Sequence, residues 1–243
     1  MPFWDHLEEL RRVFLRSIGV VLLATLVAYL LSGRLLEMIV VNSIGQATFL
    51  SPMEAFNARL KIAFLIGIVA SAPVLLWQIW AFVVPGLMHK ERKTVGPLVF
   101  WSVLLFYGGV AFSYFYVTPT VLHLLVGMGT AHIRPQIAVS YLLDFIVTMS
   151  FASGILFELP VVVAILSMIE IVTPSFLLKR WRHAVVVTFV LTAIITPGDV
   201  MIAQLVLGVP VLVLYFSSVL VSKAIWRGKK EKSRFAILNE TDE

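Results

Sequence analysis

The chain has 243 residues, of which 60% are hydrophobic and 14% charged, with a net charge of +5 and no cysteine. Soluble domains are near half apolar and a quarter charged, so this composition excludes an ordinary soluble domain. The lack of cysteine excludes disulfides and thiolate metal sites.

Long stretches without Asp, Glu, Lys or Arg divide the chain; they cover residues 17–33, 62–89, 94–133, 145–157, 183–198 and 200–222. A helix needs about 20 apolar residues to cross a hydrocarbon core of about 30 Å, so most of these stretches predict transmembrane helices. We expect one all-α integral membrane domain over residues 1–243, with six spans at about 15–32, 60–84, 97–118, 143–168, 183–196 and 200–221.

The segment before the first span, residues 1–12, is expected to be a short interfacial helix. Its apolar residues recur at spacings of four, three and four and so share one helix face: Phe3, Leu7, Leu10 and Phe14. The first apolar run lacks a small-residue cleavage site and is followed by five further spans, which argues against a cleaved signal peptide.

Two short motifs predict helix starts between the spans. In Ser51-Pro52-Met53-Glu54, Ser51 and Glu54 have the spacing of a capping box, with Pro52 at the first helical position. Thr173-Pro174 opens a helical turn in the same way. Between spans three and four, the long stretch 119–140 is expected to hold a helix lying along the membrane surface.

The fifth span is short. Residues 183–196 number 14, about 21 Å of helix. Thr196-Pro197-Gly198-Asp199 then turns the chain directly into the sixth span. Asp199 has the residue type expected to satisfy backbone donors in such a turn.

The basic residues set the orientation of the spans. Fifteen of the 19 Lys and Arg residues lie on one side: three before span one, three between spans two and three, three between spans four and five, and six in the tail at 223–243. Cytoplasmic loops collect Lys and Arg, so we expect both termini to be cytoplasmic. The positive charge is thereby explained by topology, and we expect no nucleic-acid partner.

Glu158 is the most informative single residue. A helix that begins at Asp144 places this carboxylate 14 residues along, about 21 Å deep. A charged side chain there costs about 2.5–3.5 kcal/mol, so it needs a partner, a proton or a wet cavity. Pro160 lacks an N–H and is expected to bend the helix at the same place. Two interpretations remain: a buried packing residue, or a polar site for a partner or proton.

The other acidic residues carry less information by themselves. Glu8, Glu9 and Glu91 lie next to basic residues and have the pattern of solvated ion pairs. The histidines lack metal-ligand spacing, and no nucleophile–base arrangement or nucleotide-binding loop is present, so we expect no enzyme activity, metal or cofactor.

Several motifs, in order along the chain, resemble those of the TatC family. They are His6-Leu7-Glu8-Glu9-Leu10-Arg11, Ser51-Pro52-Met53-Glu54-Ala55-Phe56, Ser71-Ala72-Pro73 through Trp80-Ala81-Phe82 to Pro85, His89-Lys90-Glu91-Arg92, Tyr114-Phe115-Tyr116-Val117-Thr118-Pro119, Phe157-Glu158-Leu159-Pro160, and Thr196-Pro197-Gly198-Asp199 with Gln204. The resemblance covers almost the whole chain. It implies a concave, cup-like six-helix fold with short fifth and sixth spans and both termini in the cytoplasm.

The resemblance also implies a function. Members of this family are receptors of the twin-arginine translocase that bind Arg-Arg signal peptides and recruit TatA- and TatB-type subunits, for proton-motive-force-driven export of folded proteins. It assigns signal-peptide contact to Glu9 and Glu91, with Arg11 beside them, and partner contact within the membrane to Glu158 and Gln204. Glu54, Pro85, Pro160 and Asp199 are assigned structural roles.

We therefore expect a multi-pass subunit of a prokaryotic cell membrane that self-associates in a larger complex. The alternative is a proton-coupled secondary transporter that uses Glu158 as its relay. No internal repeat is visible, which counts mildly against the transporter folds built from inverted halves.

Overall fold

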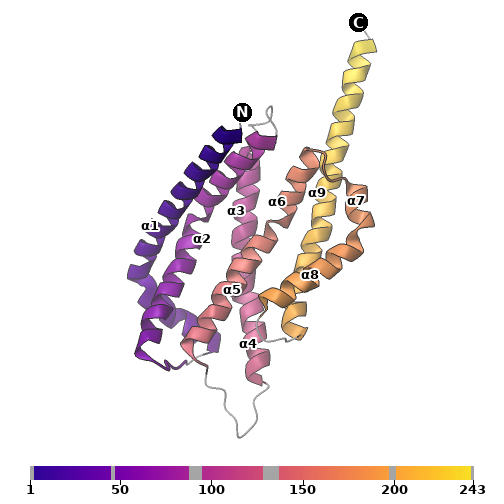
Figure 1. Cartoon of the computed structure of the whole chain (residues 1–243). Coiled ribbons are helices and arrows are strands. Elements are labelled where there is room, and N and C mark those ends of the chain that lie inside the picture. Colours follow the sequence, from indigo (N-terminus) through magenta and orange to yellow (C-terminus); the bar gives the residue numbers. More distant parts are fainter. Residues whose placement is uncertain (1–2, 45–46, 88–94, 128–136, 197–200, 242–243) are drawn as a thin grey trace.

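The protein is described by a computed structural model that places residues 3–44, 47–87, 95–127, 137–196 and 201–241. Its helices are α1 (Phe3–Ile44), α2 (Pro52–Leu87), α3 (Val95–Phe112), the π-helix η2 (Ser113–Val117), α4 (Thr118–Gly127), α5 (Val139–Phe157), α6 (Leu159–Met168), α7 (Pro174–Lys179), α8 (Trp181–Ile195) and α9 (Met201–Thr241). Figure 1 shows α1 beginning at the same end of the bundle at which α9 projects out. We call this the N-terminal end.

The predicted all-helical membrane fold is confirmed. In the part of the chain that the structure describes, five helical segments are long and apolar enough to cross a membrane: Leu7–Ser43, Pro52–Val83, Gly96–Gly127, Val139–Met168 and Met201–Lys229. The predicted short fifth span corresponds to α8, which has 15 residues, about 22 Å. Among the described residues, β pairing is limited to one isolated bridge, between Thr48 and Ala138.

The expected separate helix at residues 1–12 is not seen, because α1 is one continuous helix of 42 residues. No proline interrupts it, and its charged residues near the start, such as Arg11 and Arg12, are exposed and leave the backbone hydrogen bonds intact. The expected surface helix after span three is also different. α4 continues from α3 through the π turn, in which the N–H of Thr118 donates to the carbonyl of Ser113.

Small residues allow the helices to approach closely at two crossings. A Cβ on Gly67 would lie 2.2 Å from Thr25 Oγ1, so α1 and α2 are in direct backbone contact there. A Cβ on Gly109 would lie 2.6 Å from the carbonyl oxygen of Ser153, which brings α3 equally close to α5. Close approach through small residues is a common means of packing membrane helices.

At the end opposite the N-terminus, Glu54 joins three segments. Its carboxylate accepts the N–H of Leu50 at 2.5 Å and the N–H of Ser140 at 2.8 Å. The N–H of Glu54 donates to the carbonyl of Ser51. The predicted capping box is confirmed in part, because the Glu54 side chain reaches back to the Ser51 backbone, but it also accepts from Leu50 and from Ser140 at the start of α5.

At the N-terminal end, α9 is fixed to the segment that follows α6. Lys229 donates to the carbonyl of Met168 at 2.6 Å and to the carboxylate of Glu170 at 2.8 Å. One turn earlier, the indole of Trp226 donates to the carbonyl of Val172. The predicted helix start at Thr173 is confirmed, since its hydroxyl accepts the N–H of Phe176 at the beginning of α7.

Candidate functional site

Glu158 occupies a break between two helices. α5 ends at Phe157 and α6 begins at Leu159, with Pro160 in the first turn of α6. Pro160 has no N–H to continue the hydrogen-bond ladder, so the predicted disruption of the helix is confirmed. The backbone of Glu158 is nevertheless satisfied, because its N–H donates to the carbonyl of Ile155 and its carbonyl accepts from Val161 and Val162. The functional interest of this break therefore lies in the carboxyl group of Glu158.

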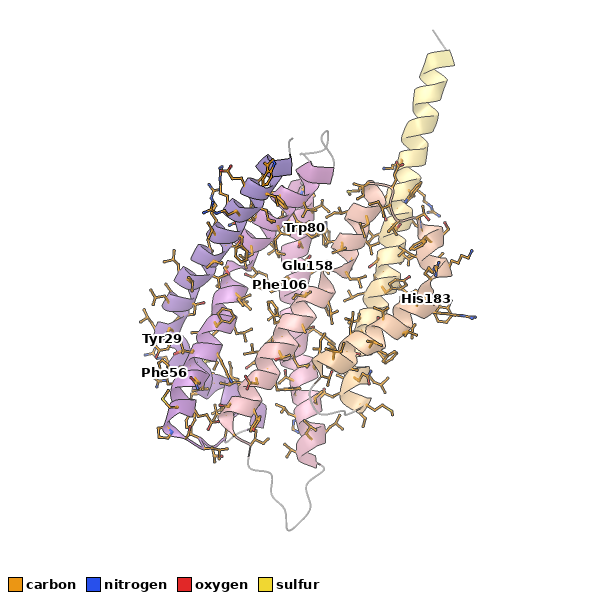
Figure 2. All side chains as sticks on the ribbon, viewed as in Figure 1. Tyr29, Phe56, Trp80, Phe106, Glu158 and His183 are labelled. Atoms are coloured by element: carbon orange, nitrogen blue, oxygen red, sulfur yellow. The ribbon has the colours of Figure 1, made fainter. Side chains whose placement is uncertain are left out.

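A chain of three side chains ends on the carboxylate of Glu158. The indole Nε1 of Trp80, on α2, donates to the hydroxyl of Ser102, on α3, at 2.8 Å. The same hydroxyl donates to Oε2 of Glu158 at 2.5 Å. All three side chains are buried, and Figure 2 shows Trp80 and Glu158 close together in the interior of the bundle. Because Ser102 accepts from the indole, its own hydrogen is directed to the carboxylate.

The second oxygen of the same carboxyl group is different. Oε1 of Glu158 is buried and has no hydrogen-bond partner among the described residues. The neighbouring side chains are mainly apolar and do not replace the missing hydrogen bond. The hydrogen-bond chain lies beside an apolar cluster from α2, α3 and α6 that includes Leu76, Phe106 and Val161. A polar atom left unpaired in such an environment is costly. The site therefore has unused capacity for one hydrogen bond.

The depth of Glu158 is compatible with contact from within the bilayer. Ten residues of α6 separate it from Met168, about 15 Å of helix. On the preceding turn Ile155 is 52% exposed, so the surface beside the carboxyl group is open on that side of α5.

Two predicted signal-peptide residues lie at the N-terminal end. Glu9 and Arg11 are exposed on the first turns of α1. Glu8, the neighbouring acid, forms a surface ion pair with Arg12 at 3.5 Å. α2 ends and α3 begins at the same end of the bundle (Figure 1). Glu91 lies outside the described residues, and its proximity to Glu9 stays a prediction.

Gln204 is used inside the chain. Its side-chain amide donates to the carbonyl of Phe189 at 2.7 Å and so ties α9 to α8. One turn further along α9, Gly208 packs against Phe189 and Thr192. Gln204 and Glu158 make no hydrogen bond to each other, so they are separate polar positions. Asp199 lies outside the described residues, and position 85 falls in the last turn of α2.

The sequence did not identify Trp80 and Ser102 as site residues. Trp80 was noted only within a motif, and Ser102 is one of many small hydroxyl residues in apolar segments. Their roles depend on the lateral packing of α2, α3 and α5, which no local pattern encodes. The site is a hydrogen-bonding site, and the described residues contain no cluster of three or more His, Asp or Glu able to hold a metal ion.

Comparison with known proteins gives a consistent result. Residues 5–210 match the family model described as "Sec-independent protein translocase protein (TatC)". A protein of that name from Carboxydothermus hydrogenoformans is 35% identical over 228 residues, covering 93% of this chain and 94% of the relative. A Helicobacter pylori protein of the same name is 34% identical, with 90% and 88% covered. A crystal structure of the twin-arginine translocase receptor TatC superposes with a TM-score of 0.80 at 32% identity, covering 90% of this chain and 99% of that one.

Proposed function

Because this chain belongs to the TatC family and is a core receptor subunit of the twin-arginine translocase, we propose that its N-terminal end binds the Arg-Arg segment of signal peptides. The second part of the proposal is that Glu158 contacts a partner helix. The observation that supports the second part is the unpaired, buried Oε1 of Glu158. The observation that supports the first is the exposed Glu9 on α1.

The chemistry of signal-peptide recognition follows from the groups available. A guanidinium group binds a carboxylate through two parallel hydrogen bonds, and a lysine ammonium cannot reproduce that geometry. Glu9, with Glu91 as the second acid, supplies one carboxylate for each arginine of the pair, and Arg11 lies two residues from Glu9. The end that carries these residues is the cytoplasmic one, because it also carries most of the basic residues.

The test uses the protein in phospholipid nanodiscs and a fluorescent signal peptide that contains either Arg-Arg or Lys-Lys. We expect Glu9→Gln and Glu91→Gln each to weaken binding of the Arg-Arg peptide by about tenfold, since each removes a charge-assisted pair. Glu8→Gln, the same change on the neighbouring residue, is the matched control and shifts the affinity by less than about twofold. Unchanged affinity in both the Glu9 and Glu91 variants contradicts the assignment.

The partner for Glu158 is a single-span subunit of the TatA or TatB type. A buried carboxyl group with one free acceptor atom favours a neighbouring helix that brings a polar side chain, with a coupling of about 0.6–2 kcal/mol. In this proposal the bundle recruits such subunits by lateral contact within the membrane and self-associates in the complex. The complex uses the proton-motive force to move folded proteins across a prokaryotic cell membrane. Ser102 and Trp80 hold the carboxylate in position for that contact.

A further inference from the structure

At the end opposite the N-terminus, two arginines of the α1–α2 hairpin lie close together. The helices run antiparallel, with Thr25 against Gly67 and Gly33 against Arg59. A Cβ added to Gly33 would lie 3.6 Å from Nη2 and 3.7 Å from Cζ of Arg59, so this guanidinium group rests over the backbone of Gly33. Arg34 is the next residue, with its Cα about 3.8 Å from that of Gly33. The guanidinium group of Arg59 therefore lies beside the backbone from which the Arg34 side chain starts.

Neither arginine is neutralised by the chain. Both side chains are exposed, and among the described residues no carboxylate forms an ion pair with either of them. Of the acids at this end, Glu54 accepts two backbone N–H groups, and Asp144 pairs with Lys61 at 2.6 Å. The exposed Glu37, three residues after Arg34 on α1, forms no ion pair with either arginine. Two adjacent like charges without a counter-ion favour the binding of an anion.

The depth of this pair identifies the anion. Residues 17–33 form an uncharged run of about 26 Å in α1, so Arg34 lies at the edge of the hydrocarbon layer, where lipid phosphates are found. The neighbouring surface is apolar and open: Leu30 is 82% exposed, Leu31 53% and Phe56 49%. Only 6% of the most apolar stretch of α1 is buried within the bundle, so lipid acyl chains cover this face.

We propose that Arg34 and Arg59 form a binding site for the phosphate of a phospholipid headgroup, in the leaflet opposite the N-terminus. Guanidinium groups bind phosphate oxygens bidentately, and one phosphate between the two arginines removes their mutual repulsion. The acyl chains of the same lipid lie against Leu30 and Leu31. This site is independent of the proposed signal-peptide and partner contacts, which lie at the other end and in the middle of the bundle.

A single label tests the proposal, because the chain has no cysteine of its own. A fluorophore on Leu30→Cys, one turn from Arg34, reports quenching by bromine atoms on lipid chains. The protein is placed in vesicles of digalactosyldiacylglycerol, a lipid without phosphate, that contain increasing amounts of brominated phosphatidylglycerol or brominated phosphatidylcholine. We expect both phospholipids to be enriched beside the label, by about fivefold or more over their bulk fraction.

The variant Arg34→Gln/Arg59→Gln is expected to reduce that enrichment to the bulk fraction, whereas Arg34→Lys/Arg59→Lys retains part of it. Arg182→Gln/Arg227→Gln removes two exposed arginines elsewhere in the chain and is the control that keeps full enrichment. Melting temperature and gel filtration establish that each variant is folded.

Five results overturn the proposal. One is unchanged enrichment in Arg34→Gln/Arg59→Gln, and another is equal loss in the control. Enrichment of phosphatidylglycerol without phosphatidylcholine shows that net charge is sensed instead of phosphate. A label that no brominated lipid quenches, or enrichment abolished by added inorganic phosphate, shows that a protein surface or a soluble anion occupies the site.

Discussion

Two buried glutamates at different depths of the bundle have opposite hydrogen-bonding states. Glu54, 7% exposed, has a backbone N–H on each carboxylate oxygen, and the two donors come from segments 90 residues apart, Leu50 and Ser140. Glu158, 9% exposed, has one donor, a serine hydroxyl, on one oxygen and none among the described residues on the other. The first carboxylate is saturated by its own chain and the second is not. The difference separates a group whose two oxygens are both hydrogen-bonded within the chain from a group with one oxygen unpaired among the described residues.

The largest effect is expected from removing the saturated carboxylate. Glu54→Ala leaves the backbone N–H groups of Leu50 and Ser140 without their acceptor and weakens the connection between this loop and α5. We expect the melting temperature in detergent to fall by about 5 °C or more, with Glu54→Gln intermediate, because the amide oxygen keeps one acceptor. Glu37→Ala, an exposed acid near the end of α1, is the matched control. A melting temperature equal to the wild type would show that the Glu54 contacts are not structural.

A smaller loss of stability is expected for Ser102→Ala. The substitution leaves the indole N–H of Trp80 without an acceptor and takes the remaining donor from Glu158, which costs about 1–3 kcal/mol. Trp80→Phe removes the orphaned donor, so the double variant is expected to be more stable than the sum of the two single changes. Additive losses in this double-mutant cycle would mean that Trp80 and Ser102 are not coupled.

The smallest effect on stability, and the clearest effect on function, is expected at Glu158. Glu158→Gln keeps an acceptor for Ser102 and changes the free energy of unfolding by less than about 1 kcal/mol. A photocrosslinker at Ile155, on the exposed side of the same turn, should capture a TatA- or TatB-type helix in the wild type. We expect weaker capture in Glu158→Gln and the weakest in Glu158→Ala, with signal-peptide binding retained in both. Equal capture and normal export in Glu158→Ala would reduce Glu158 to a packing residue.

The two glutamates also show which features of the structure can be predicted from the sequence. The depth of Glu158 and the helix break at Pro160 follow from residue counting and from the missing N–H, and the structure confirms the break. The donors Ser102 and Trp80 lie 56 and 78 residues away along the chain, and their approach depends on how three helices pack. Hydrophobic runs specify that helices cross a membrane but not which faces meet.

For Glu54, the sequence pattern predicts the helix start but not all the partners of its side chain. Its spacing from Ser51 suggested a purely local role, and the local pattern was sufficient to place a helix start at Pro52. Besides the nearby Leu50, its carboxylate also accepts the N–H of Ser140, 86 residues later. Gln204 behaves similarly, since its side-chain amide donates to the carbonyl of Phe189 on the adjacent helix, while its contact with another subunit stays a prediction. Polar side chains in lipid take whichever partner the fold brings near, and that choice is made by tertiary structure.

The length of α8 makes the bilayer itself a variable in the behaviour of this protein. Fifteen residues span about 22 Å, whereas the hydrocarbon layer is about 30 Å thick. α2 and α5–α6 are long enough for the full thickness, so we expect the bilayer to be thinner beside α8 than beside those helices. We therefore expect lipid chain length to change the stability of the protein, with no ligand involved.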